Sequence, residues 1–193
     1  GGAWMDECVV RRVTAQGIQL PVAYLCCNFS PPLHPRPSLL THDEVCTLFH
    51  EFGHGLHHLL TQVDIAAVSG INGVPWDAVE LPSQFLENWC WEPEGLSLIS
   101  GHVDTGEVLP EKMVERMLSA RNFLAGMMMV RQLEFALFDL RIHAESDSPD
   151  RPDINAVLED VRRQVAVVIP PQWHRFAHAF THVFSGGYAA GYY

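Results

Sequence analysis

The sequence predicts a mainly α-helical fold with one small β element near its N-terminus. After residue 41, apolar residues recur every three or four positions in several stretches, which is the spacing of amphipathic helices. Before residue 30, two runs rich in valine, leucine and aromatic residues are separated by turn-forming residues, a pattern typical of paired strands. We therefore expect a small hairpin followed by a set of packed helices.

The first 40 residues predict a β-hairpin and a proline-rich loop. Residues 8–13 and 18–29 are the two strand-like runs, and residues 14–17, Thr-Ala-Gln-Gly, supply the turn between them. The segment from 30 to 38 contains four prolines, so no regular structure is expected there: Pro31, Pro32, Pro35 and Pro37.

Residues 41–60 predict a helix with a defined start. Thr41 and Glu44 have the spacing of a capping box, in which each side chain accepts a hydrogen bond from the other residue's backbone N–H. An apolar stripe follows at helical spacing: Val45, Leu48, Phe49, Phe52, Leu56 and Leu59. Gly53 costs about 1 kcal/mol of helix propensity relative to alanine, which suggests that another segment passes close to the backbone there.

The rest of the chain predicts further helices. Residues 77–91 form the first of them, and Pro82 requires that this helix either kinks or starts anew. The later helices are expected at residues 110–145 (one long helix or two abutting ones), at 154–169 with Asp153 as the N-cap, and at 173–184. We expect residues 1–193 to be a single domain or a substantial piece of a larger one, with 110–193 as its helical part.

Composition and charge exclude several classes of protein. The formal net charge of -11 and the pI of about 5.3 argue against a nucleic-acid partner, which requires a basic surface. No apolar run reaches the length of a transmembrane helix, so no membrane partner is expected. The five cysteines are odd in number and form no CxxC pair, which favours reduced thiols in a cytoplasmic protein.

Residues 50–54, His-Glu-Phe-Gly-His, have the HExxH pattern inside the predicted capped helix. Side chains four residues apart lie on one helical face, so the imidazoles of His50 and His54 can bind the same ion. Glu51 reaches the site from the side, where it can serve as a base toward a water molecule. The pattern predicts one Zn²⁺ per chain. The alternative, a helical domain with a chance HExxH, does not explain the position of the motif behind a capping box.

A catalytic zinc takes three protein ligands, and the third ligand distinguishes classes of zinc enzyme. The HExxHxxGxxH class is excluded, because this chain has His57 and Leu60 where that class has glycine and histidine. We expect His57 and His58 to have structural roles. A glutamate from a later helix is the alternative, and the candidates are Glu80, Glu87, Glu92 and Glu94, with Asp77 less favoured. On one unbroken helix Asp77, Glu80 and Glu87 would share a face, so one carboxylate could bind the metal while another orients a ligand.

Three segments resemble the active-site region of the thimet oligopeptidase and neurolysin family of zinc metallopeptidases. They are residues 50–58 (HEFGHGLHH), 69–70 (Ser-Gly) and 77–91 (DAVELPSQFLENWCW). The resemblance implies a multi-helix, zincin-type catalytic domain in which residues 77–91 carry the third zinc ligand, Glu80. Residues 178–193 (HAFTHVFSGGYAAGYY) are similar to the family's substrate-binding segment. This second likeness implies that His182 and Tyr188 contact the peptide and the developing oxyanion.

The resemblance also implies a function. It suggests a zinc-dependent endopeptidase that hydrolyses short, unfolded peptides with a zinc-activated water and Glu51 as the general base. Members of the family are several times longer, so the chain is expected to be a C-terminal catalytic fragment. Two alternatives follow: a zinc-binding but catalytically incompetent piece that needs the missing N-terminal region, or a module that docks a partner chain through the face which that region would cover.

Overall fold

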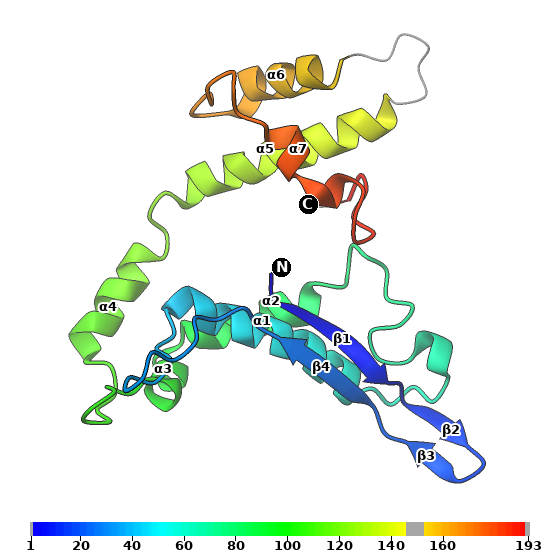
Figure 1. The fold of residues 1–193 in the computed structure, drawn as a ribbon, viewed down its shortest axis with the longest axis vertical. Helices are drawn as coiled ribbons and strands as arrows, with labels where there is room; N and C mark the ends of the chain where they lie inside the picture. The colour runs from blue at the N-terminus through cyan, green and yellow to red at the C-terminus, as the bar shows by residue number, and fades with distance from the viewer. Residues whose placement is uncertain (1, 146–152, 192–193) are drawn as a thin grey trace. The chain divides into compact units, whose positions relative to one another are not determined.

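The computed structural model describes residues 2–145 and 153–191, and its mainly helical architecture confirms the predicted fold class (Figure 1). The chain divides into two compact units, Gly1–Leu118 (unit 1) and Ser119–Tyr193 (unit 2). Within these described residues, unit 1 contains the strands β1 to β4 and the helices α1 to α3, and unit 2 contains α5 to α7. Within the described residues, every helix is too short or too polar to cross a lipid bilayer.

The predicted hairpin is present, with its turn between Thr14 and Gly17. It consists of two antiparallel pairs, β1 (Trp4–Val9) with β4 (Val22–Cys26) and β2 (Arg12–Thr14) with β3 (Gly17–Gln19). The first strand begins at Trp4, four residues earlier than the sequence indicated. Alternate residues of β1 are half-buried, because β1 and β4 pack along α1 (Figure 1).

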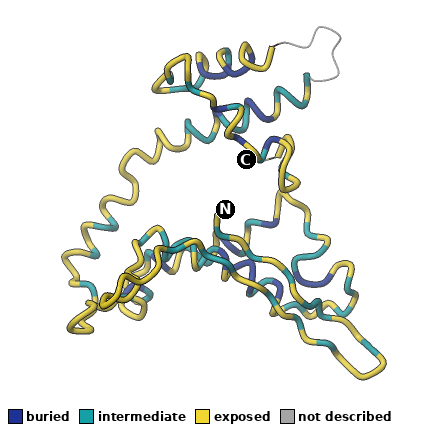
Figure 2. Tube along the Cα trace, viewed as in Figure 1, coloured by how far each residue is buried: buried dark blue, intermediate teal, exposed yellow. Residues whose placement is uncertain are grey.

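Helix α1 (His42–Leu59) begins where the capping box predicts. The Thr41 hydroxyl accepts a hydrogen bond from the Glu44 backbone N–H at 3.2 Å, and the Glu44 carboxylate accepts from the Thr41 N–H at 2.7 Å. Unusually, the buried residues of α1 are polar or lack a side chain: Glu51, Gly53, His54, Gly55 and His58. Members of the apolar stripe remain partly exposed, notably Leu48, Phe52 and Leu59. Figure 2 shows that buried residues occupy only short stretches of the chain.

Helix α2 (Leu81–Glu87) crosses α1 at Gly53. A Cβ atom on Gly53 would lie 2.6 Å from the Pro82 carbonyl oxygen and 2.6 Å from the Ser83 Cα, so only glycine allows this approach. The expectation that a segment passes close to Gly53 is therefore confirmed. Pro82 lies in the first turn of α2, where its missing N–H is not needed. Of the two possibilities at this proline, the helix starts anew rather than kinking.

The segments after α2 are shorter than expected. Helix α2 runs directly into a 3-10 turn, η2 (Asn88–Cys90), and then into α3 (Pro93–Ile99), which the sequence did not predict because seven residues show little periodicity. Another 3-10 turn, η1 (Ala66–Val68), follows α1. The predicted helix over 110–145 is two helices, α4 (Glu111–Ala120) and α5 (Ala125–Ala144). Leu124 separates them with a left-handed backbone, φ 57°.

Unit 2 has its core between α5 and α6 (Ile154–Val165). Asp153 caps α6 as predicted, accepting from the Asn155 N–H at 2.6 Å, but the helix ends at Val165 instead of residue 169. The last predicted helix, 173–184, is wrong in length, because only α7 (Phe176–Ala179) and the 3-10 turn η3 (Thr181–Val183) form. Packing overrides the helical repeat here, because side chains of this C-terminal stretch enter the core that α5 and α6 form. The buried residues of this core are Phe138, Val157, Leu158, Val161, Phe176, Phe180 and Val183.

The crossing at Gly53 gives a direct test of the fold. In the Gly53→Ala variant the gain in helix propensity is about 1 kcal/mol, but the new methyl group meets rigid backbone, and overpacking of this kind costs about 1–3 kcal/mol. We expect a lower melting temperature. Gly55→Ala is the matched control, because its methyl group would meet side chains at ordinary contact distances, Leu25 at 3.5 Å and Phe52 at 3.9 Å, and no backbone. Equal melting temperatures for the two variants would contradict the close crossing.

Candidate metal centre

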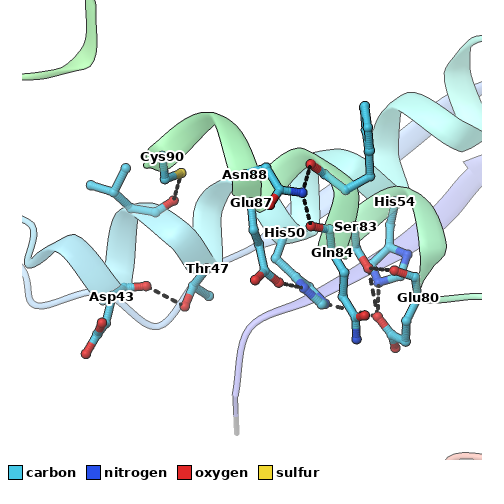
Figure 3. Close-up of polar contacts among 12 residues, drawn as sticks. Asp43, Thr47, His50, His54, Glu80, Ser83, Gln84, Glu87, Asn88 and Cys90 are labelled. Carbon is cyan, nitrogen blue, oxygen red and sulfur yellow. Dashed lines mark hydrogen bonds and ion pairs between the residues drawn. The ribbon is translucent and has the colours of Figure 1, made fainter. Parts of the chain in front are cut away.

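His50 and His54 on α1 and Glu80 at the N-cap of α2 converge on one point (Figure 3). The Nε2 atoms of His50 and His54 lie 3.2 and 3.1 Å from the same carboxylate oxygen, Oε2 of Glu80. The imidazole rings are nearly perpendicular, at 84°, with their centroids 5.1 Å apart. Two imidazoles and one carboxylate thus present three ligand atoms within 4.8 Å of one another.

This arrangement fits a zinc ion. Zn–N and Zn–O bonds of about 2.0–2.2 Å in a tetrahedron separate neighbouring ligand atoms by about 3.3 Å. The two nitrogen–oxygen separations are 3.1 and 3.2 Å, so little movement would be needed to bind the ion. Two histidines and a glutamate are also a ligand set that catalytic zinc sites use while keeping a fourth position open.

The electrostatics of the group favour a positive charge between the three side chains. Hydrogen bonds from His50 and His54 hold the pKa of Glu80 far below its usual range. The hydrogen bond to Glu80 raises the pKa of His50 to about 9, although burial acts in the opposite direction. The proton on Nε2 of His50 therefore points toward Glu80. A metal ion that binds at Nε2 must displace this proton, because only neutral imidazole binds a metal.

Two further side chains of α2 hold the group in place. The Glu87 carboxylate lies 2.6 Å from Nδ1 of His50, the ring nitrogen that faces away from Glu80. Ser83, which is fully buried, donates to Glu80 Oε2 at 2.8 Å. Sequence reasoning missed Ser83, although its place three residues after Glu80 was a usable signal. Among the described residues, Nδ1 of His54 is buried with no such partner.

Glu51 lies on the buried side of α1, next to His50, and is only 7% exposed. Burial raises the pKa of Glu51 above its ordinary value, and the charges of His50 and His54 counteract part of this effect. A carboxylate with a raised pKa accepts a proton more readily near neutral pH, which suits a general base.

The other predicted candidates lie away from the group. Asp77 is exposed in the turn that precedes α2, and Glu92 and Glu94 are exposed at the start of α3. His58 is fully buried, with its Nε2 atom 3.0 Å from the Val9 backbone oxygen, so it ties α1 to β1. His57 lines a shallow groove between α1 and α2, and burial lowers its pKa.

His182 and Tyr188 belong to unit 2 and contact each other. His182 lies in η3, and its ring packs edge-to-face on the Tyr188 ring with centroids 5.2 Å apart. Gly186 and Gly187 between them have φ angles of 77° and 81°, which favour glycine. The neighbouring Tyr192 and Tyr193 lie outside the described residues.

The metal centre predicts a defined stoichiometry. We expect the purified chain to bind one zinc ion, measured by inductively coupled plasma mass spectrometry after removal of excess metal. His50→Ala and Glu80→Ala should each lose the ion, because two protein ligands rarely hold a catalytic zinc. His178→Ala is the control, since His178 is exposed in unit 2. Full zinc occupancy in His50→Ala would show that the ion binds elsewhere.

Comparison with known proteins agrees with this geometry. The chain matches peptidase family M3 over residues 1–193. Over 194 residues it is 61% identical to oligopeptidase A of Salmonella typhimurium and 60% identical to that of Escherichia coli, covering 100% of this chain and 28% of each relative. Saccharolysin of Saccharomyces cerevisiae is 37% identical over 178 residues, which are 90% of this chain and 24% of that protein. The chain thus spans less than a third of the length of these relatives. Because the match covers its full length and includes the segments that carry His50, His54 and Glu80, the chain belongs to peptidase family M3.

Proposed function

We propose that this chain carries the zinc centre of an endopeptidase that hydrolyses short, unfolded peptides. The observation that carries the proposal is the convergence of His50, His54 and Glu80, with the buried carboxylate of Glu51 beside them. Relatives up to 61% identical are named oligopeptidase A, and this name supports short peptides as the substrate class.

Glu51 is the residue that moves protons in the proposed reaction. When bound, zinc supplies Lewis acidity, which polarises a carbonyl group and lowers the pKa of a coordinated water to about 7. Glu51 accepts the proton of the attacking water and later transfers it to the leaving amine, so one carboxylate serves as base and then as acid. Its position on the buried side of α1, next to a ligand, supports both roles.

Glu87 and Ser83 position the ligands in this proposal. By accepting from Nδ1–H of His50, Glu87 fixes the tautomer in which Nε2 has a free lone pair for the metal. The hydroxyl of Ser83 holds one oxygen of Glu80 and so restricts the rotation of its carboxylate. For Asp77, which is exposed, we propose no contact with a ligand.

His182 and Tyr188 are proposed to donate hydrogen bonds to the substrate and to the oxyanion that develops on it. Their support is the likeness of residues 178–193 to the substrate-binding segment of the family, together with their mutual ring contact. Donors of this kind typically contribute about 100- to 1,000-fold to the rate. The two glycines at 186 and 187 allow the tyrosine to change its position as peptide binds.

A second candidate function is a zinc-binding piece that turns over peptide only with further chain or a partner. It is favoured by the apolar groove of about 500 Å³ between α1 and α2, which includes Leu56, Leu60 and Phe85. Phe85 is 62% exposed, and the chain spans only 28% of the oligopeptidase A relatives. Zinc binding without turnover would support this alternative. A cytoplasmic location belongs to either proposal, because an odd number of cysteines without a CxxC pair favours reduced thiols.

The role of Glu51 can be separated from metal binding. We expect Glu51→Gln to retain its zinc but to lose at least about 100-fold in kcat on a quenched fluorescent peptide, because a carboxamide cannot accept the proton. Asp43→Asn makes the same chemical change at an exposed position of α1 and should leave kcat unaltered. Cleavage by Glu51→Gln at the wild-type rate would rule out the assigned base.

Glu87 should control metal affinity. Removing the carboxylate in Glu87→Ala leaves Nδ1 of His50 without its acceptor, and such changes lower metal affinity by about 10- to 100-fold. The zinc dissociation constant can be measured by competition with a chromogenic chelator. Glu94→Ala, which removes an exposed carboxylate from α3, is the control. Unchanged affinity in Glu87→Ala would mean that the hydrogen bond does not support the ligand.

A further inference from the structure

A second group of reactive side chains connects α1 to η2 outside the metal centre. His42 and Cys46 are one turn apart on α1, and Cys90 is the last residue of η2. None of the three belongs to the candidate metal-binding group. Figure 3 shows Cys90 over α1, where its Sγ atom lies 4.0 Å from the Val45 backbone oxygen. We call these three residues the His42 cluster.

The backbone contact of His42 determines which of its ring nitrogens carries the proton. Nε2 lies 2.8 Å from the carbonyl oxygen of Cys90, and because a carbonyl can only accept, Nε2 is the donor. In the neutral ring Nδ1 is then an acceptor, and it lies 3.7 Å from the Sγ atom of Cys46. The Trp91 ring packs edge-to-face on the imidazole at a centroid distance of 4.3 Å and helps to fix its orientation. The imidazole is thus oriented to take the proton of the Cys46 thiol.

The two thiols contact each other but differ in reactivity. Burial, together with the charge of Cys46 and a hydrogen bond with it, raises the pKa of Cys90 to about 12. Cys90 is fully buried, whereas Cys46 is only partly buried, so a reagent from solvent meets Cys46 first. Neither cysteine forms a disulfide in this structure. An accessible thiol with an adjacent base and a second thiol in contact has the components needed for thiol–disulfide exchange.

We propose that Cys46 and Cys90 are an oxidation site, at which a low-molecular-weight disulfide such as glutathione disulfide converts the two thiols into one intrachain disulfide. In the first step, His42 Nδ1 accepts the proton of Cys46, and the thiolate attacks the disulfide to form a mixed disulfide and one glutathione thiolate. That thiolate takes up the proton.

In the second step the sulfur of Cys90 attacks Sγ of Cys46, gives up its proton and expels a second glutathione. The two protein thiols lose two electrons and two protons, and glutathione disulfide gains them to become two glutathione molecules. The second step is the slow one, because burial raises the pKa of Cys90 and so lowers the fraction of its thiol that is ionised.

The resulting bond would cross-link the two elements that hold the metal ligands. Cys46 is one turn before His50 on α1, and Cys90 follows Glu87 by three residues. The hydrogen bond between Glu87 and His50 therefore lies next to the new bond. The reaction itself uses neither zinc nor Glu51, so it can be tested whatever the outcome of the proposed function.

The test is disulfide mapping of the zinc-loaded chain after incubation with glutathione disulfide at neutral pH. Remaining thiols are alkylated under denaturing conditions, and the digest is analysed by mass spectrometry. We expect a peptide pair joined through Cys46 and Cys90, preceded in time by a mixed disulfide on Cys46. In Cys90→Ala the mixed disulfide should accumulate, and in Cys46→Ser the cross-link should be lost. Cys26→Ser is the matched control, because Cys26 is also partly buried but belongs to β4.

His42 provides a second readout that a purely structural role would not affect. In His42→Phe an aromatic ring still packs on Trp91, but the base is absent, so loss of the Cys46 thiol should slow by roughly 100-fold. An unchanged rate in this variant would overturn the role of His42. A disulfide between Cys26 and Cys27, with Cys46 and Cys90 still open to alkylation, would overturn the proposal as a whole.

Discussion

The close crossing of α1 and α2 at Gly53 is the contact on which the candidate metal centre depends. The missing side chain lets the backbone of Pro82 and Ser83 rest directly on α1. Glu80, immediately before α2, then lies over the Nε2 atoms of His50 and His54, and Glu87 reaches the other side of His50. A side chain at position 53 would move α2 outward, and both carboxylates with it. One steric constraint thus brings together candidate ligands from two segments about 30 residues apart in the sequence.

The sequence predicted well those features whose causes are local. The capping box defined the start of α1, and the four-residue spacing of His50 and His54 placed both on one face. The identity of the third carboxylate was not local. The sequence contains four glutamates that could each be the third ligand: Glu80, Glu87, Glu92 and Glu94. Only the crossing of α2 over α1 shows which carboxylate reaches both histidines. Family resemblance indicated Glu80, whereas the residues alone left the choice open.

The shorter helices escaped prediction because packing decides their length. Residues 173–184 have helical spacing, yet the chain forms only α7 and η3 there, since Phe176, Phe180 and Val183 gain more by entering the core of unit 2. Helix α1 shows the converse. Its apolar stripe remains partly exposed while its polar, chemistry-bearing side is buried. An exposed apolar surface of this kind is typical of an interface, and the relatives are more than three times as long as this chain.

The segment formed by α2 and η2 acts as one short, continuous arm along α1. At the start of this arm, Pro82 contacts Gly53 of α1. In its middle, Glu87 contacts His50. At its end, Cys90 contacts His42. No loop interrupts the arm, so a displacement of Cys90 is carried back to Glu87 within one helical turn. Because Glu87 contacts Nδ1 of His50, the proposed oxidation of the thiols at one end would influence the candidate ligand at the centre. The same packing that brings His50, His54 and Glu80 together would therefore couple them to the proposed oxidation of Cys46 and Cys90.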